Sequence, residues 1–139
     1  MYKIKEVAQK LDISEHTLRF WAKCGFFPFV QRDKNNIRQF SEDDLGWVKI
    51  VKCLRDAGTD TKSIKKYIDL CLLGDSTIEE RYKIIYKTRE KALQRQQEIN
   101  KQIDLLNYKV EFYQNLIKTQ KKDPWNPMNA ELSNIKCSK

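Results

Sequence analysis

The chain contains neither glycine nor proline between Ile78 and Pro124. Within this segment, positions from Tyr82 to Ile117 recur at alternating intervals of three and four over about five heptads, and all are apolar except Arg89 and Gln96. This pattern is typical of a coiled-coil seam. We therefore predict one helix over residues 78–119, about 60 Å long at about 1.5 Å per residue. The predicted seam residues are Tyr82, Ile85, Ala92, Ile99, Ile103, Leu106, Val110, Tyr113 and Ile117.

A single helix of this length cannot bury its own apolar stripe, so it needs a partner to be stable. We predict that residues 76–120 form a coiled-coil dimerisation segment whose seam is covered by a second copy of the chain. Folding of the helix back onto the preceding residues is the alternative. At its start, Thr77 and Glu80 have the spacing of a capping box. The remaining residues, 121–139, are rich in Asn, Pro and Ser and are predicted to form a C-terminal tail.

Residues 1–75 have the pattern of a small helical head. A first helix is indicated by apolar residues at helical spacing, namely Ile4, Val7, Ala8 and Leu11. A second helix is predicted over Glu15–Lys23, because Ser14 is a good N-cap and Gly25 is suited to the left-handed stop after a helix. Its buried side is predicted to consist of Leu18 with Trp21 or Ala22.

The segment that follows is predicted to form a β wing over residues 29–40. Its turn lies at Asp33–Asn36, because Asp and Asn tolerate positive φ, and residues 37–40 return as a short strand. A third helix begins after Ser41 with acidic residues in its first turn, where the helix dipole favours negative charge. A fourth helix begins after Asp60. The predicted core faces of these two helices are Trp47, Ile50, Val51 and Leu54, and then Ile64, Tyr67, Ile68 and Cys71.

Charge and composition narrow the class of protein. The net charge of +8 at pH 7 favours an anionic partner, and residues 1–38 hold 8 basic residues against 4 acidic ones. The N-terminus has no apolar stretch typical of a secretory signal, and no apolar run approaches the roughly 20 residues that span a bilayer, so we expect a cytoplasmic protein with no membrane partner. The four cysteines form no Cys-x-x-Cys pair and are not expected to form disulfides. With one histidine, no phosphate-binding glycine loop and no nucleophile motif, the chain is expected to have neither an enzymatic activity nor a cofactor.

The motifs, taken in order, resemble those of MerR-family transcription regulators. In the head, the matching residues are Ile4-x-Glu6-Val7-Ala8, Thr17-Leu18-Arg19-Phe20-Trp21, Gly25-Phe26-Phe27-x-Phe29 and Arg38-x-Phe40-Ser41-x-x-Asp44-Leu45. The start of the long helix, Gly74-Asp75-Ser76-Thr77-Ile78-Glu79-Glu80-Arg81, is also similar. The resemblance covers residues 2 to about 119. It implies a mainly α fold, in which a winged helix-turn-helix DNA-binding domain at 1–75 precedes a coiled-coil helix that pairs antiparallel in a homodimer.

In such a head the second helix is the recognition helix, whose early residues reach base edges while Arg and Lys further along contact phosphate. The residues expected to bind DNA are Glu15, His16, Thr17, Arg19, Trp21 and Lys23 in this helix, and Tyr2, Lys3, Arg32, Lys34 and Arg38 elsewhere in the head. Arg38 resembles the phosphate-contacting arginine of the family, and Arg32 and Lys34 are its neighbours, for which a solvated turn is the alternative. Thr17 either donates to a phosphate or closes a helical turn. Trp21 would use its indole N–H.

The resemblance also implies a mechanism. The dimer would bind near-palindromic double-stranded promoter DNA, distort an over-long promoter spacer, and so act on RNA polymerase indirectly. Two alternatives for the whole chain are a coiled-coil protein-interaction module and a MerR-like repressor with no small-molecule effector.

Cys53 is the candidate sensor residue. Its setting, Cys53-Leu54-Arg55-x-x-Gly58, is similar to that in the aldehyde- and thiol-stress-responsive branch of the family. Lys49, Lys52 and Arg55 lie nearby in sequence, and neighbouring cations favour the reactive thiolate. A small core residue on the third helix is the alternative. Metal-sensing relatives carry a cysteine near the start of the coil and a cysteine-rich loop after it. No metal site is expected here, because Cys71 precedes the coil, Cys137 is isolated in the tail and the long helix has no cysteine.

Overall fold

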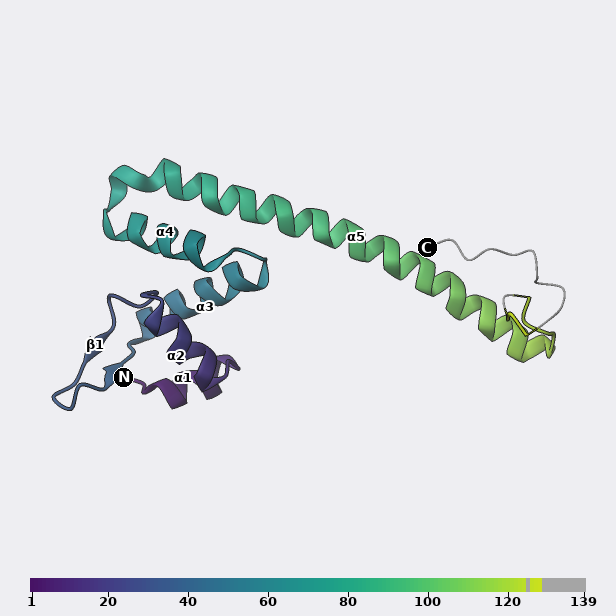
Figure 1. Cartoon of the computed structure of the whole chain (residues 1–139), viewed down its shortest axis with the longest axis horizontal. Helices are drawn as coiled ribbons and strands as arrows, with labels where there is room; N and C mark the ends of the chain where they lie inside the picture. Colours follow the sequence, from purple (N-terminus) through teal and green to yellow (C-terminus); the bar gives the residue numbers. More distant parts are fainter. Residues whose placement is uncertain (125, 129–139) are drawn as a thin grey trace. The chain divides into compact units, whose positions relative to one another are not determined.

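The computed structural model of the chain describes residues 1–124 and 126–128, which are mostly helical (Figure 1). The elements, in chain order, are α1 (Ile4–Leu11), α2 (Glu15–Lys23), β1 (Gln31–Arg32), β2 (Arg38–Gln39), α3 (Glu42–Asp56), α4 (Thr61–Leu72), the 3-10 turn η1 (Asp75–Thr77) and α5 (Ile78–Thr119). The predicted mainly α fold, with a small wing and one long C-terminal helix, is confirmed. Much of the predicted tail, residues 125 and 129–139, lies outside the described residues.

The chain forms two compact units, residues 1–94 and residues 95–139. The first unit holds α1 to α4, the wing and the first turns of α5, and the second begins within α5. The domain boundary predicted at residue 75 stays a prediction.

The helix-turn-helix follows from local signals in the sequence. Ser14 is the N-cap of α2, because its Oγ accepts a hydrogen bond from the backbone N–H of Thr17 at 3.0 Å. Asp12 takes the left-handed conformation between α1 and α2, with φ of 54°. Gly25 has φ of 80°, which confirms the predicted stop after α2.

The core of the first unit is made by apolar side chains from α1 to α4 and the aromatic run between α2 and α3. The rings of Phe27 and Phe40 meet edge to face with centroids 5.6 Å apart, and those of Phe29 and Trp47 lie 5.2 Å apart. Phe40 is fully buried at the end of the wing, so it fastens the wing to the helices.

The core faces of α3 and α4 differ in part from the prediction. Buried on α3 are Leu45, Val48, Val51 and Leu54, whereas the predicted Trp47 and Ile50 are only half-buried. Buried on α4 are Ile64, Ile68 and Leu70, whereas the predicted Tyr67 and Cys71 are only half-buried. Both helices carry more apolar residues than one face can hold. Tertiary packing therefore decided which of them face the core.

The link between α4 and α5 is built differently from the predicted capping box. Thr77 is only 5% exposed, and its hydroxyl donates to the carbonyl oxygen of Leu70 at 2.5 Å, with that of Gly74 at 2.8 Å. The side chain of Arg81 donates to Thr77 Oγ1 and to the Gly74 carbonyl, each at 3.1 Å. Thr77 therefore ties the start of α5 back to the end of α4 instead of capping the first turn ahead of it.

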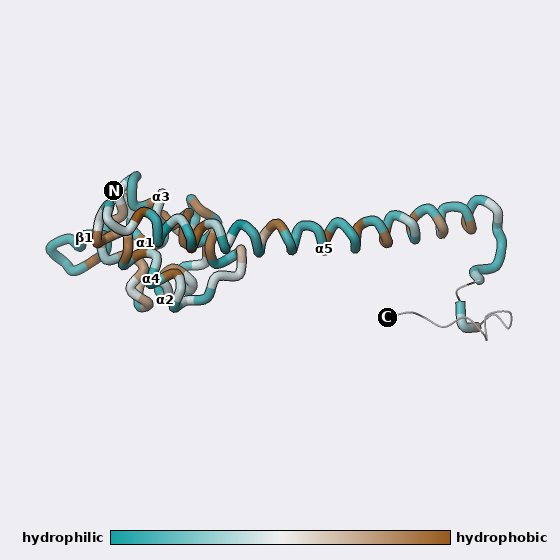
Figure 2. Tube along the Cα trace, turned by 90° about the horizontal axis from the view of Figure 1, so that it is seen from above, coloured by the Kyte–Doolittle hydropathy of each residue, from teal (hydrophilic) through white to brown (hydrophobic). Residues whose placement is uncertain are grey.

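The long helix α5 has no buried residue in the single chain. All nine predicted seam residues are exposed, and Figure 2 shows apolar positions recurring along α5 between hydrophilic ones. In the described part of the chain no helix, α5 included, combines the length and the apolar character needed to cross a membrane.

Candidate nucleic-acid interface

The exposed face of α2 carries a row of basic and aromatic side chains. Leu18 and Trp21 point into the core, so the opposite side of the helix faces solvent. On that side lie His16, Arg19 and Lys23, spaced by three and four residues as neighbours on one helix face. A helix that offers cations on one solvent-facing stripe is suited to the major groove of a duplex.

Arg19 is held only loosely in the absence of a ligand. Its guanidinium lies 3.6 Å from the Glu15 carboxylate, and the two side chains are 63% and 43% exposed. An exposed i,i+4 ion pair of this kind contributes little to stability. Arg19 therefore remains available to exchange its partner for a base edge or a phosphate.

Thr17 serves the local structure of α2. Its hydroxyl accepts a hydrogen bond from Ser14 Oγ at 2.7 Å, and its backbone N–H donates to the same oxygen. This geometry favours the closing of the first helical turn, and a phosphate contact by Thr17 stays a prediction.

The wing is ordered by one carboxylate. Asp33 Oδ1 accepts from the backbone N–H groups of Asn35 at 2.8 Å and Ile37 at 3.0 Å, while Gln39 Nε2 donates to Oδ2 at 3.2 Å. These hydrogen bonds lower the pKa of the Asp33 carboxyl group, and the one from Ile37 has the largest effect. Asn36 has φ of 63°, in agreement with the predicted turn.

The fold brings the basic residues of the wing close to α2. Arg38 is half-buried, while Arg32 and Lys34 are exposed near the tip. Burial, then the positive charges of Arg32 and Arg19, lower the pKa of the Arg38 guanidinium. One patch therefore holds Arg19 of α2 together with Arg32 and Arg38 of the wing. Repulsion within such a patch is relieved when an anion such as phosphate binds between the charges.

At the N-terminus, Tyr2 has structural partners. Its backbone pairs with that of Phe40 through two hydrogen bonds of 2.8 Å, a strand-like bridge that sequence reasoning missed. Its hydroxyl donates to Glu42 Oε1 and accepts from Lys10 Nζ at 3.3 Å. The hydrogen bond that Lys10 donates to Tyr2, then the charges of Tyr2 and Glu42, raise the pKa of Lys10. Lys3 is the N-cap residue of α1 and is exposed, and its contact with the DNA backbone stays a prediction.

Trp21 is a correction to the predicted DNA contacts. Its side chain is only 4% exposed and belongs to the hydrophobic core of the first unit. The indole ring of Trp21 faces the core and not solvent, because burial of its apolar surface is favourable. We therefore leave Trp21 out of the proposed contacts.

Phe20 and Arg55 were missed by sequence reasoning. Phe20 is 51% exposed beside Arg19, and its position four residues after His16 is the signal that places it on the same face. Arg55 is exposed near the end of α3, and with α2 it lines an open hollow. Only the packing of α3 against α2 brings Arg55 to this surface.

Cys53, the candidate sensor, is exposed on α3, whereas Cys24 and Cys71 are half-buried. The alternative of a small core residue is therefore wrong for Cys53.

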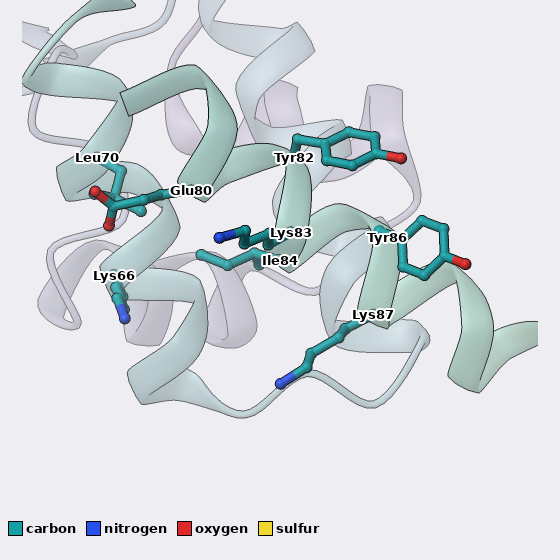
Figure 3. Close-up of a pocket in the computed structure, with 8 residues that line it drawn as sticks. All are labelled: Lys66, Leu70, Glu80, Tyr82, Lys83, Ile84, Tyr86 and Lys87. Atoms are coloured by element: carbon teal, nitrogen blue, oxygen red, sulfur yellow. The ribbon is translucent and has the colours of Figure 1, made fainter. Parts of the chain in front are cut away.

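A second surface feature lies between α4 and the first turns of α5 (Figure 3). This groove has a volume of about 730 Å³ and is lined by Lys66, Leu70, Glu80, Tyr82, Lys83, Ile84, Tyr86 and Lys87. In Figure 3, the rings of Tyr82 and Tyr86 extend from α5 to the side away from Lys66 and Leu70, and their centroids lie 5.9 Å apart. Tyr82 is also the first predicted seam residue, so the exposed stripe of α5 begins beside the head.

Comparison with known proteins gives consistent matches. The family model described as "MerR HTH family regulatory protein" matches residues 2–71. An "Uncharacterized HTH-type transcriptional regulator" of Haemophilus influenzae is 37% identical over 113 residues, which make up 81% of this chain and 84% of the relative. The "HTH-type transcriptional regulator AdhR" of Bacillus subtilis is 32% identical over 66% of this chain and 65% of its own length.

A solved structure is similar over most of the chain. It is that of "HiNmlR, a MerR family regulator lacking the sensor domain, bound to promoter DNA", with a TM-score of 0.77 and 36% sequence identity. The match covers 84% of this chain and 93% of that one. The similarity therefore extends beyond the helix-turn-helix into the long helix.

Proposed function

Because this chain belongs to the MerR HTH family, whose members are DNA-binding transcription regulators and not enzymes, we propose that it binds double-stranded promoter DNA as a homodimer. The observation that carries this proposal is the convergence of Arg19 on α2 with Arg32 and Arg38 of the wing. In a complex, α2 lies in the major groove and the wing lies along the adjacent phosphates. The structure of the similar HiNmlR, which is bound to promoter DNA, supports the proposal that this chain binds promoter DNA.

The proposed DNA contacts divide by chemistry. Base edges are read by Arg19 and His16, and phosphates are bound by Lys23 and Arg38. The outer part of the same interface is formed by Arg32, Lys34, Lys3 and Glu15. Phosphate contacts by arginine and lysine release counterions, so binding weakens as salt increases.

The exposed stripe of α5 supports homodimerisation. Its nine seam residues are exposed in the single chain, and removal of such apolar surface from water favours association. We propose an antiparallel pairing of two α5 helices, which relates the two heads by a two-fold axis. A two-fold dimer requires a near-palindromic operator with half-sites spaced by whole helical turns.

Binding at two half-sites would distort the promoter spacer and so change the engagement of RNA polymerase without a direct protein contact. Such a regulator acts in the cytoplasm, where the chromosome lies. We also propose that Cys53 reacts with electrophiles such as aldehydes, because its thiol is exposed and Lys49 lies one helical turn before it. A repressor with no small-molecule effector is the second candidate.

The test of DNA binding uses the purified full chain and fragments of the source genome. At physiological salt, it should retain a small set of promoter fragments, and footprinting of these should reveal two symmetric half-sites. Equal retention of all fragments would contradict sequence-specific binding. Binding of another protein in place of any duplex would favour the coiled-coil interaction module.

A further inference from the structure

Phe20 occupies an unusual place for an apolar side chain. It is 51% exposed on α2, one helical turn after His16, and it does not belong to the hydrophobic core. Exposure of a phenyl ring to water is unfavourable, so the ring gains free energy from any apolar partner that covers it. It has no hydroxyl and so cannot reach a phosphate by a hydrogen bond.

The surroundings of Phe20 combine an apolar wall with a cation. An open hollow of about 370 Å³ is lined by His16, Thr17, Phe20 and Trp21 of α2 and by Arg55 of α3. Arg55 uses one guanidinium nitrogen to donate to the Thr59 carbonyl at 3.4 Å, and the guanidinium carries further N–H donors. The hollow therefore offers an apolar contact and a site for an anion next to each other.

These two features match a thymine nucleotide seen from the major groove. The C5 methyl group of thymine is the apolar group that a natural base exposes there, and phenylalanine is one of the side chains suited to it. The phosphates of the same strand follow the edge of the groove, where an arginine on a neighbouring helix reaches them. The positive charge of Arg55 in the hollow, with Arg19 and Lys23 exposed on the same helix as Phe20, favours DNA over a protein surface as the occupant.

We propose that the hollow between α2 and α3 receives one thymine in each half-site, with Phe20 against its C5 methyl group and Arg55 on a nearby phosphate. Phe20 is then a specificity-determining residue, and Arg55 is a positioning contact. The inference rests on the proposed function, because it requires α2 to lie in the major groove.

The test of Phe20 replaces single thymines by deoxyuridine, which removes only the methyl group. The probe is the duplex that the native chain enriches from genomic fragments, and the proteins are the native chain and Phe20→Ala. At one symmetric pair of positions, replacement of thymine by deoxyuridine should weaken binding of the native chain by about four-fold per half-site. This is the effect of one methyl group in an apolar contact. The same DNA change should leave the affinity of Phe20→Ala unaltered.

The outcomes separate the inference from its premise. If the native chain selects a duplex but no thymine position is sensitive, or if Phe20→Ala keeps the same sensitivity, the thymine contact is wrong while DNA binding stands. If the native chain selects no duplex, the proposed function itself fails. Circular dichroism of Phe20→Ala should show native helix content, because the ring lies outside the core.

The test of Arg55 measures affinity for the same duplex over a series of salt concentrations. Arg55→Gln should reduce the slope of log affinity against log salt by about one per subunit and weaken all sequences equally. Lys101→Gln, which removes an equal charge from an exposed position on α5, is the matched control and should keep the native slope. An unchanged slope in Arg55→Gln would exclude the phosphate contact.

Discussion

Arg19 on the recognition helix and Arg38 on the wing lie close enough to interact, although 19 positions separate them in the sequence. Burial, then the charges of Arg32 and Arg19, lower the pKa of the Arg38 guanidinium. Like charges held together in this way are unfavourable in the free protein. They would become favourable with a phosphodiester backbone between α2 and the wing, so the proximity of Arg19 and Arg38 supports the proposal that this surface binds DNA.

The two arginines should have separable effects on DNA binding. Arg38→Ala should weaken all duplexes alike and reduce the salt slope by about one per subunit, because it removes a phosphate contact. Arg19→Ala should cost about 1–3 kcal/mol of binding free energy and relax preference at one base pair in each half-site. Fluorescence anisotropy with single-base variants of the selected duplex measures both. An equal loss of affinity for all duplexes in Arg19→Ala would indicate that Arg19 contacts the DNA backbone and not a base.

Dimerisation should depend on the seam of α5. Ile99→Glu together with Ile103→Glu places two charges on the exposed apolar stripe, where a partner helix would have to desolvate them. Sedimentation equilibrium should show a monomer at micromolar concentration, and specific DNA binding should be lost. Gln102→Glu, on the same segment outside the seam, is the control and should remain dimeric. A dimer that survives both seam charges would contradict pairing along this stripe.

Electrophile sensing should require Cys53. An aldehyde or a quinone should form an adduct on Cys53, as detected by mass spectrometry, and change transcription from the target promoter in vitro. Cys53→Ser should abolish the change, whereas the half-buried thiols of Cys24 and Cys71 should be dispensable. A full response in Cys53→Ser would favour a regulator without this effector.

The stability of α4 should depend on pH through its N-cap. Asp60 Oδ1 accepts from the backbone N–H of Ser63 at 2.7 Å, and this hydrogen bond is the first cause of the lowered pKa of Asp60. A carboxyl group with a depressed pKa contributes stability above its unfolded value of about 3.9, and this is lost as pH falls through the folded value. Asp60→Ala should therefore lower Tm at neutral pH, and the difference from the native chain should shrink in acid. Asp104→Ala on α5 is the control, and an equal pH profile in both variants would refute the cap contribution.

The link between α4 and α5 should be sensitive to one hydroxyl group. Thr77→Val keeps the shape of the side chain but removes one donor to the Leu70 carbonyl, which still accepts from the N–H of Leu73. The free energy of unfolding should fall by about 1 kcal/mol. Urea denaturation followed by circular dichroism measures the change. Thr119→Val removes a hydroxyl that donates to a carbonyl on the exposed end of α5, and it should be nearly neutral. If the native chain and Thr77→Val had equal free energies of unfolding, the hydrogen bond would make no net contribution to stability.

The sequence by itself determined the elements and their order. Ser14, Asp60 and Gly25 act through atoms within a few residues of themselves, so their caps and turns were correctly predicted. The long helix α5 was also correctly predicted, because it has a regular helical pattern without glycine or proline, whereas the pairing of its seam stays a prediction. Contacts of this range need no knowledge of the rest of the fold.

Only the tertiary structure decided which side chains face the core and which face solvent. Trp21 on α2 was predicted both as a core residue and as a DNA contact, and packing placed it in the core. Phe20 remains exposed, and Arg55 of α3 lines the same hollow as Phe20. Thr77, which has the spacing of a cap, turned back to the end of α4 because the link between the helices put the Leu70 carbonyl within its reach. These outcomes depend on how helices distant in sequence pack together, and local periodicity carries no information about that packing.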